Sequence, residues 1–571
     1  MIPHLGRLVL GLSLSFWAAL VAADNSTFYN PILPGWHSDP SCIHVDGTFY
    51  CITSSFITFP GLPVYASKDL INWKLISHAW NRQSQMPNVT QQTKGQQEGF
   101  YAATIRYHDG EFWVVCEYLG LPDGMLGTVF KTSNPFDAES WSDPYTFLTP
   151  NGDLDLFWDD DGKMYIPGGG HVLLDVDLEA GTVVNNTFLW AGTGGVWPEG
   201  PHLYRKDGWY YISAAEGGTE TGHYQVMARS SSLTGPYQPC PYNPVLTNKG
   251  TDEYFQTIGH ADLFQDSDEN WWGVALATRS GPEWRIYPMG RETVLYPVTW
   301  REGEWPILEP VRGKMSGWQM PAASRDLPGD GPFNSDPDAY DFTTLSGIPR
   351  NLIHWRVPTE GAFSIDSSRG LHIVPSRANL TGDNADLDGR SGLSFIGRPQ
   401  TDSLFTFEAV IDAPLTDADQ ESGVTLFLTQ FNHADIGVVI LPKADGSGGN
   451  DRMLRFRATG EDAHAENIVK VPEAWGEDSI RFQIATVNST HCTMAASQAS
   501  QSDQRVVIST FSARLVSGQS GPFTGSLVGV YATCNGAGSG VDCPSGGDSW
   551  VKEWHYEGQG QYYTATDLVP E

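Results

Sequence analysis

Along most of this 571-residue chain, apolar and polar residues alternate in short runs that turn residues separate. The runs are rich in aromatic and β-branched residues, and Gly, Pro, Asn or Asp interrupts them every few positions. A period of two is typical of half-buried strands, whereas the period of a helix is scarce after residue 23. The pattern predicts an all-β protein.

One hairpin motif recurs five times in the first 320 residues. In each copy an apolar strand passes through a turn rich in acidic residues into a strand rich in aromatic residues. The copies are CIHVDGTFYCI, TIRYHDGEFWVV, LFWDDDGKMYI, HLYRKDGWYYI and LFQDSDENWWGV, with turn residues Gly47, Gly110, Gly162, Gly208 and Asn270. Their spacings of 63, 52, 46 and 62 residues suit four-stranded blades with loops of different lengths. We therefore expect a five-bladed β-propeller over residues 24–325, with the hairpin WREGEWPI as an outer part of the fifth blade.

A different pattern follows the fifth copy. The stretch PAASRDLPGDGPFNSDPDAY is rich in Pro, Gly and Asp, and we place a linker at residues 326–340. Beyond it, runs such as LFTFEAVI and GVTLFLTQF alternate like half-buried strands and have the spacing of a β-sandwich. Residues 341–571 are therefore expected to form a C-terminal β-sandwich domain.

The N-terminus has the pattern of a secretory signal peptide over residues 1–23. Arg7 precedes the apolar run LVLGLSLSFWAAL, and Val21-Ala22-Ala23 supplies the small residues of a cleavage site. The run is too short for a membrane span, so we expect a secreted, extracellular protein without a membrane partner. Sequons for N-glycosylation agree with this expectation; they lie at Asn25, Asn88, Asn185, Asn379 and Asn488.

The net charge narrows the choice of partners. The formal charge is −33 and the sequence pI is about 4.6. Such a surface repels nucleic acid and anionic membranes, and it suits a neutral partner or an acidic medium. The same charge would also keep a secreted protein soluble, whatever it binds. No obligate protein partner is evident from the sequence.

Seven Cys residues leave at least one without a partner in the same chain. Asp46-Gly47 is a strong two-residue hairpin turn, and counting outward from it places Cys42 opposite Cys51 at a non-hydrogen-bonded pair. We expect a disulfide there. Cys534 and Cys543 are candidates to close a Gly-rich loop. The pairing of the remaining three stays open; they are Cys116, Cys240 and Cys492.

The repeat also brings chemically active residues into one phase. Eight to ten positions before the turns, the first strands of four blades open with Asp39, Asp153, Glu199 and His260. The second blade has Tyr101 and Ala102 there. Equivalent positions of a propeller lie on a ring around its axis, so these side chains are expected to converge in one pocket. Taken singly, each acidic residue could instead be a turn former at the start of a strand.

Three carboxyl groups in one pocket permit glycoside hydrolysis. Like charges crowded in a pocket push the pKa values of the groups apart, so one carboxyl can stay protonated while another stays ionised. Trp197 and two prolines surround Glu199 with apolar groups, which favours the protonated form and the role of general acid. Asp39 has polar neighbours and is expected to remain ionised as the general base. A third carboxylate would hold the acid in place, and a base that activates water implies inversion, with base and acid roughly 6.5–9.5 Å apart.

Six stretches carry a resemblance to a known family. They are NPILPGWHSDPSC, SSFITFPGLPVYASKDLINW, DLDLFWDDDGKMY, WPEGPHLY, IGHADLFQ and GRETVLYPVTW. Together they resemble glycoside hydrolase family 43, in particular its fungal secreted β-xylosidases and α-L-arabinofuranosidases, and the likeness covers propeller, linker and sandwich. The resemblance implies an inverting exo-hydrolase that releases arabinofuranosyl or xylosyl residues from arabinoxylan or xylo-oligosaccharides and requires no cofactor.

The resemblance also implies roles for individual residues. The base falls on Asp39, the residue that tunes and orients the acid on Asp153, and the acid on Glu199. The central histidine falls on His260, which in relatives can help to hold a water molecule or a calcium ion, so a structural calcium near the axis stays open. The substrate-contacting residues are expected at Arg291, Phe56, Tyr101, Trp36 and His260.

Two departures from the family pattern concern the pocket wall. Many relatives have Phe-Asp-Pro where this chain has Gly152-Asp153-Leu154, which removes an aromatic side chain. Relatives often have Trp followed by Ala-Pro-Thr where this chain has Tyr101 followed by Ala-Ala-Thr. We expect a pocket that admits an arabinofuranosyl branch as well as, or instead of, a xylosyl end. Asp155 is a rival to Asp153, but we expect it to face away from the pocket.

Two other functions remain open. A retaining β-fructofuranosidase-type enzyme also joins a propeller to a sandwich, but it needs Asn-Asp-Pro-Asn-like, Arg-Asp-Pro and Glu-Cys stretches. This chain has His-Ser-Asp-Pro-Ser and Glu199-Gly200, and it lacks Arg-Asp-Pro. A non-catalytic carbohydrate-binding propeller would not need the three carboxylates. The sandwich either binds polysaccharide or braces the propeller and lends a loop to the rim of the pocket.

Overall fold

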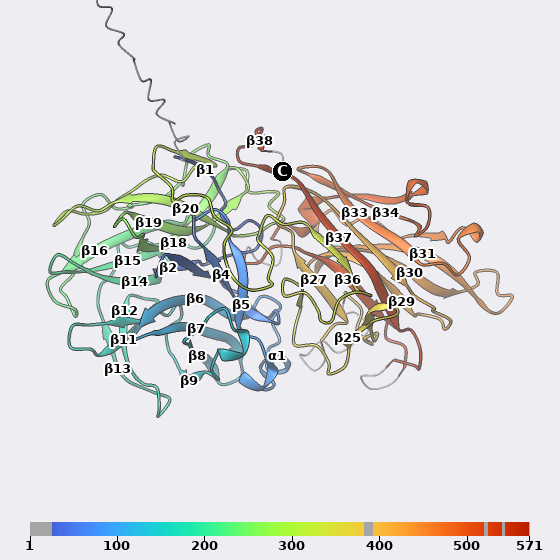
Figure 1. Cartoon of the computed structure of the whole chain (residues 1–571), viewed down its shortest axis with the longest axis horizontal. Coiled ribbons are helices and arrows are strands. Elements are labelled where there is room, and N and C mark those ends of the chain that lie inside the picture. Colours follow the sequence, from blue (N-terminus) through green and yellow to red (C-terminus); the bar gives the residue numbers. More distant parts are fainter. Residues whose placement is uncertain (1–25, 382–391, 519–522, 539–542, 570–571) are drawn as a thin grey trace, which may run out of the picture.

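The protein forms two β domains that lie side by side, a propeller and a sandwich (Figure 1). The structure, a computed structural model, describes residues 26–381, 392–518, 523–538 and 543–569. Helical segments of these residues are short: α1 (Val89–Gln92), η1 (Gln83–Gln85), η2 (Ala138–Ser140), η3 (Glu473–Trp475), η4 (Ser502–Gln504) and η5 (Ala513–Val516). The predicted all-β class, with a five-bladed propeller and a C-terminal sandwich, is confirmed. The predicted signal peptide lies outside the described residues.

Each of the five blades is an antiparallel sheet of four strands in chain order. The strands are β2 (Ser41–Val45), β3 (Thr48–Ile52), β4 (Gly61–Ser67) and β5 (Lys74–Trp80); β6 (Gly99–His108), β7 (Glu111–Leu121), β8 (Gly124–Thr132) and β9 (Tyr145–Leu148); β10 (Phe157–Trp158), β11 (Met164–Gly168), β12 (Val172–Asp177) and β13 (Thr182–Phe188); β14 (Glu199–Lys206), β15 (Trp209–Glu216), β16 (Tyr224–Ser230) and β17 (Gln238–Pro239); β18 (Phe255–Gln265), β19 (Trp271–Arg279), β20 (Glu292–Thr299) and β21 (Ile307–Leu308). β1 (Thr27–Tyr29) pairs with β22 (Lys314–Ser316), so the two ends of the propeller segment are held together. The hairpin WREGEWPI joins β20 to β21, which confirms its predicted place in the fifth blade.

Asp-Gly turns explain why these hairpins form. In the first, second and fourth blades such a pair joins the first two strands: Asp46-Gly47, Asp109-Gly110 and Asp207-Gly208. The φ angles are 48–52° at Asp and 74–82° at Gly. Positive φ at both residues is the type I′ geometry, whose twist matches that of antiparallel strands. The turns therefore fix the register of each hairpin and the position of the residues that open its first strand.

A network of buried charges occupies the propeller axis. Arg106 of β6 lies 2.9 Å from Asp155 and 2.8 Å from Asp262 of β18. His202 Nδ1 is 3.2 Å from Asp155 Oδ2, and Tyr204 Oη donates a 2.8 Å hydrogen bond to Asp262 Oδ1. Burial would raise the pKa of Asp262, but Arg106 and His202 hold it far below its usual range. The network ties four blades together below the mouth of the channel.

Two sheets form the sandwich. The nine-stranded sheet contains β23 (Asp338–Asp341), β25 (Phe363–Asp366), β26 (Gly370–Ile373), β28 (Leu404–Asp412), β33 (Ile480–Asn488), β34 (His491–Gln498), β35 (Val506–Ser512), β37 (Ser549–Tyr562) and β38 (Leu568–Val569). The seven-stranded sheet contains β24 (Ile353–His354), β27 (Phe395–Pro399), β29 (Glu421–Thr429), β30 (Asn432–Pro442), β31 (Asn450–Thr459), β32 (Asn467–Lys470) and β36 (Leu527–Thr533). Alternate residues of both sheets, such as Phe407, Val424 and Ile436, form the buried core between them.

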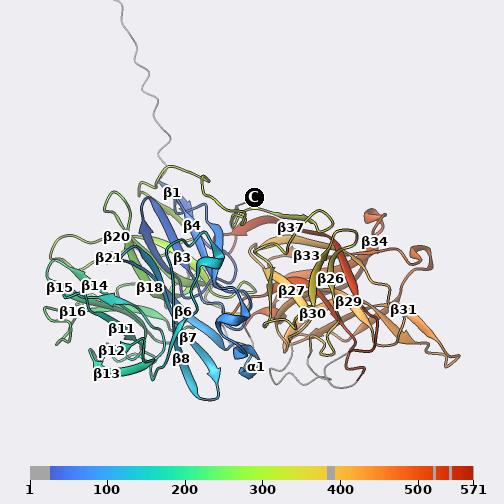
Figure 2. The same cartoon turned by 60° about the horizontal axis from the view of Figure 1, so that its bottom comes forward.

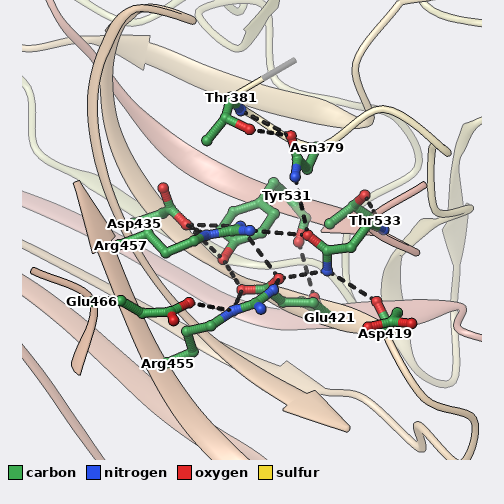
Figure 3. A network of polar contacts seen from close by, with 12 residues as sticks. Asn379, Thr381, Asp419, Glu421, Asp435, Arg455, Arg457, Glu466, Tyr531 and Thr533 are labelled. Carbon is green, nitrogen blue, oxygen red and sulfur yellow. Dashed lines mark hydrogen bonds and ion pairs between the residues drawn. The ribbon is translucent and has the colours of Figure 1, made fainter. Parts of the chain in front are cut away.

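The other face of the seven-stranded sheet carries buried charges (Figure 3). Arg457 Nη2 of β31 lies 3.2 Å from Glu421 Oε2 of β29 and 3.0 Å from Asp435 Oδ2 of β30. Tyr531 of β36 donates a 3.0 Å hydrogen bond to Glu421 Oε1. Burial would raise the pKa of Asp435, but Arg457 and His433 lower it to about 2. The network links four adjacent strands.

The sandwich packs directly against the propeller. In both views its sheets adjoin the first blade (Figure 1 and Figure 2). One apolar cluster contains Trp36 and Phe56 of the propeller together with Phe427 and Leu527 of the sandwich. The buried Arg279 side chain reaches across the interface to oxygen atoms of β37 at 2.8 and 3.0 Å. The two domains therefore share a buried interface with apolar and polar contacts.

Two disulfides are present. Cys42 and Cys51 face each other on β2 and β3 with Cα atoms 4.2 Å apart, and Cys534 is joined to Cys543. The other three cysteines are buried and outside any disulfide; they are Cys116, Cys240 and Cys492.

The predicted sequons differ in exposure. Asn88, Asn185 and Asn488 are exposed, whereas Asn379 is only 6% exposed. The Asn379 amide nitrogen, the atom that a glycan would occupy, donates a 3.2 Å hydrogen bond to Asn535. Asn379 is therefore a poor glycosylation site. The remaining sequon, Asn25, lies outside the described residues.

Candidate active site

Five residues with left-handed backbone form a ring at the mouth of the channel, one in each blade. They are Asp39, Ala102, Asp153, Gly200 and His260, with φ between 45° and 54°. In the second, fourth and fifth blades the pairing of the first two strands is interrupted at this point, so the innermost strand bulges. Such backbone costs a non-glycine residue about 1–3 kcal/mol, and strain of this kind gathers at functional sites. The ring therefore marks the candidate active site.

Glu199 is not itself a member of the ring. Counting along the repeat put Glu199 in phase with Asp39, but Gly200 occupies that position. A Cβ atom on Gly200 would lie 2.9 Å from two carbon atoms of the His260 ring, so a side chain does not fit there. Glu199 comes one residue earlier, at the start of β14. The repeat thus located the blade correctly and missed the phase by one residue.

Asp39 is a buried carboxylate held by several donors. Nη1 and Nη2 of Arg291 donate to its two oxygen atoms at 2.8 and 3.2 Å, and Ser54 Oγ donates at 2.6 Å. His260 Nδ1 lies 3.8 Å away. Burial would raise the pKa of Asp39, but Arg291, His260 and the Ser54 hydrogen bond together lower it below its ordinary value. Asp39 is therefore an anion that can accept a proton.

Asp153 contacts the backbone next to Glu199. Its Oδ2 atom accepts a 2.9 Å hydrogen bond from the amide of Gly200. Burial raises the pKa of Asp153, and the charges of Glu199 and Asp39 raise it further against the opposing effects of His260 and this amide. The position of the Glu199–Gly200 peptide therefore depends on Asp153.

We expect from the sequence that Asp155 faces away from the pocket. The structure differs, because Asp155 points towards the propeller axis, as Asp153 does. Residues two apart in a strand share a face, so alternation does not separate Asp155 from Asp153. Asp155 is fully buried, and its carboxyl lies 2.9 Å from Arg106 and 3.2 Å from His202 in the axial network. The neighbour of Glu199 is Asp153, because Asp155 is held by these groups deeper in the channel.

His223 lies against Glu199, a contact that no pattern in the sequence indicated. His223 Nε2 is 3.1 Å from Glu199 Oε1, and His223 Nδ1 is 2.8 Å from Thr257 O. Because a carbonyl oxygen can only accept, Nδ1 carries the proton of the neutral ring and Nε2 is an acceptor. The neutral ring can therefore accept the hydrogen of a protonated Glu199. The predicted apolar enclosure of Glu199 is wrong in part, because the Trp197 side chain is 72% exposed.

A calcium ion beside His260 would depend on water and carbonyl oxygens, because acidic and histidine side chains are not grouped there to hold a metal in the described part of the chain. Calcium takes six to eight oxygen ligands. Within the residues that the structure describes, no group of three or more His, Cys, Asp or Glu side chains is placed to hold a metal. His260 is buried between Gly200 and Asp39 instead.

Comparison with known proteins covers nearly the whole chain. The model of Glycosyl hydrolases family 43 matches residues 28–306, and that of the Beta xylosidase C-terminal Concanavalin A-like domain matches residues 340–543. The "Non-reducing end alpha-L-arabinofuranosidase BoGH43B" of Bacteroides ovatus is 36% identical over 545 residues, which are 93% of this chain and 96% of that protein. This chain belongs to glycosyl hydrolase family 43. The resemblance inferred from its motifs is thereby confirmed, and the protein is a glycosidase.

A second relative and one solved structure are also similar to this chain. The "Xylosidase/arabinosidase 43B" of Humicola insolens is 30% identical over 434 residues, 71% of this chain and 75% of that protein. The solved structure named "Bacteroides ovatus Xyloglucan PUL GH43B" superposes with a TM-score of 0.80 at 32% identity, and it covers 93% of this chain and 99% of that chain.

Aromatic side chains of this family-43 site form one cluster, which the sandwich completes. The Phe56 ring lies 4.4 Å from that of Tyr101 and 5.6 Å from that of Trp36, measured between centroids. Phe523 of the sandwich lies 6.4 Å from Phe56, and its carbonyl oxygen accepts hydrogen bonds from Arg291 at 3.2 and 3.3 Å. Phe56 is fully buried and Trp36 is 5% exposed, so the predicted sugar contacts of these two rings are not available here. The half-buried rings of Tyr101 and Phe523 are the accessible ones.

Proposed function

We propose that this glycosidase removes terminal α-L-arabinofuranosyl residues from hemicellulose with inversion at the anomeric carbon. Asp39 is the general base, Glu199 is the general acid, and Asp153 orients and tunes the acid. The observation that carries the proposal is the contrast between two carboxyl groups. Arg291 pairs with Asp39 through both oxygen atoms, whereas Glu199 Oε1 has the imidazole Nε2 of His223 as its neighbour at 3.1 Å.

The reaction follows from these environments. Asp39 accepts a proton from a water molecule while the oxygen of that water attacks the anomeric carbon. Glu199 gives its proton to the leaving oxygen as the glycosidic C–O bond breaks. Proton exchange with solvent then returns Asp39 to the ionised form and Glu199 to the acid form. Because water attacks from the face opposite the leaving group, the configuration inverts.

Two features favour arabinose as the released sugar. A relative that matches over 96% of its own length is named a non-reducing end alpha-L-arabinofuranosidase. In addition, Gly152 omits an aromatic side chain that the family pattern places in the wall of many xylosidases. Release of β-D-xylosyl residues is the second candidate, because other relatives are named xylosidase/arabinosidase. The proposed substrates are arabinoxylan and xylo-oligosaccharides, to which we add arabinose-bearing xyloglucan because the name of the solved relative includes xyloglucan.

Trp197 is proposed to contact the polymer on the leaving-group side. Its side chain is 72% exposed, it lies two residues before the acid Glu199, and its φ of 53° is in the left-handed region. A Cβ atom on Gly218 would lie 3.4 Å from the indole, so the edge of the ring packs on that loop. A large exposed ring held in strained backbone beside the acid offers a flat platform for a sugar ring.

We also propose that the protein acts outside the cell and that its reaction requires no cofactor. Its two disulfides suit an oxidising compartment. Hydrolysis by two carboxyl groups needs no metal. Among the described residues, no helix has the length and apolar character needed to cross a membrane.

Product analysis tests the proposal. Wheat arabinoxylan, arabinose-bearing xyloglucan and xylobiose would be incubated with the enzyme and with Glu199→Ala as control. We expect arabinose from the polymers, none with the control, and the β anomer of arabinose first in NMR spectra. Xylose from xylobiose would instead favour the second candidate. The α anomer first would favour a retaining mechanism of the fructofuranosidase type, and sugar binding without turnover would favour a carbohydrate-binding propeller.

A further inference from the structure

A fourth carboxyl group, Glu117, lies next to the three proposed ones. Glu117 is in β7, where it pairs across the sheet with Tyr101 of β6. Its side chain is 2% exposed. A Cβ atom on Gly152 would lie 3.0 Å from Glu117 Oε1. The carboxyl therefore occupies the space that a side chain at residue 152 would need, directly beside Asp153.

Glu117 and Asp153 are neighbouring acids, of which Glu117 is buried and Asp153 is half-buried. Glu117 Oε1 lies against the Gly152–Asp153 segment, 3.0 Å from the position of a Cβ atom on Gly152, and the charge of Asp153 acts on it. Glu117 Oε2 is buried, and no N–H or O–H donor of the described residues reaches it. Burial raises the pKa of Glu117 well above its usual value, and the Asp153 charge raises it further. Two adjacent carboxyl groups are more stable when they share one proton than when both are charged.

The neighbouring side chains that carry a hydrogen-bond donor direct it to other acceptors and not to the Glu117 carboxyl. The other titratable side chains that face the pair are Tyr101, Cys116, Asp39, Glu199 and His260. The Tyr101 hydroxyl donates to Gln97 O, and the Cys116 thiol donates to Tyr101 O at 2.8 Å. Neither is therefore available as a donor to Glu117.

We propose that Glu117 is a positioning residue whose neutral carboxyl donates a hydrogen bond to the Asp153 carboxylate and keeps that anion ionised and oriented. The pair then holds one proton and one negative charge. Glu117 acts on the reaction only through Asp153, which in turn holds the Gly200 amide beside Glu199. The inference rests on the proposed function and adds a residue to it. It also connects the unusual Gly152 with a structural cause, since a larger residue at 152 would displace the carboxyl.

The test compares Glu117→Gln with Glu117→Leu. The amide of Gln can still donate to Asp153, whereas Leu fills the space without a donor. For Glu117→Gln we expect kcat/KM within about threefold of the wild type and an unchanged acid limb of the pH profile. For Glu117→Leu we expect a loss of about ten- to a hundredfold, the worth of a hydrogen bond to a charged group. Its acid limb should also move to higher pH, because Asp153 is protonated more easily without the donor.

Several results would overturn the inference. The first is an acid limb of Glu117→Leu that stays at the wild-type pH. The second is an acid limb of Glu117→Gln that moves as far as that of Glu117→Leu. The third is an acid limb that moves to lower pH in either variant. Should Glu117→Leu not fold, infrared difference spectra of the wild type and Glu117→Gln at neutral pH decide, because a protonated carboxyl band must disappear in the variant. The proposed function is tested separately, by the bell-shaped profile of the wild type and its loss in Glu199→Ala.

Discussion

Replacing Arg291 with Met tests whether a paired arginine keeps Asp39 ionised. Both side chains are 4% exposed, and the guanidinium donates to both carboxyl oxygens. Met is flexible and apolar, so the change removes the charge without leaving a large cavity. Burial would then raise the pKa of Asp39 without this opposing charge, and the base would be protonated at higher pH.

The magnitude follows from the contact. Opposite unit charges about 4 Å apart attract by about 4 kcal/mol at an effective dielectric constant of about 20. Removing one partner of a buried pair costs about 3–5 kcal/mol. We expect the free energy of unfolding at neutral pH to fall by that amount. Because the folded state lowers the pKa of Asp39, the pair stabilises the fold above the ordinary value of 3.8, and this contribution is lost as the pH falls.

The assay combines kcat/KM on a chromogenic arabinofuranoside with thermal unfolding, both followed from acid to neutral pH. In Arg291→Met the acid limb should move to higher pH, and its deficit in Tm should shrink in acid. Arg279→Met is the matched control, since Arg279 is equally buried and pairs with Glu292 at 2.6 and 2.8 Å. It should lower stability and leave the acid limb in place. An unmoved limb in Arg291→Met, or an equal shift in the control, would refute the reasoning.

Three further predictions concern other contacts. His223→Ala should lower kcat roughly ten- to a hundredfold on polymers and less on aryl glycosides, whose good leaving groups need little help from Glu199; equal losses on both would contradict the acid role. Trp197→Ala should raise KM for polymers several-fold, because loss of the ring contact costs about 1 kcal/mol of binding, while turnover of aryl glycosides and Tm stay unchanged. An unaltered KM for polymers would contradict the proposed contact of Trp197 with the polymer. Asp435→Asn should lower stability at neutral pH by about 3–5 kcal/mol, because Arg457 loses a buried partner. Burial would raise the pKa of Asp435, but Arg457 and His433 lower it to about 2. The loss of stability in Asp435→Asn should therefore fade as the pH falls from about 4 towards 2. A deficit in Tm that is independent of pH would contradict this prediction.

The sequence alone determined the architecture and most of the site. Alternation with a period of two and Asp-Gly turns depend on neighbouring residues, so they predicted strands and the register of hairpins such as that around Asp46-Gly47. The five copies of the motif predicted five blades. Because blades repeat around an axis, phase along the chain becomes position in space, which is how Asp39, Asp153 and His260 were found without a structure.

Only the tertiary structure decided what surrounds these residues. His223, Glu117 and Phe523 reach the site from a loop, from the second strand of a blade and from the other domain, and no local period records where such segments meet. Burial is likewise a property of the assembled domains, which is why Phe56 was expected to face the sugar and is fully enclosed. The protonation states of the carboxyl groups depend on these same contacts, because burial and nearby charges act through space and not along the chain.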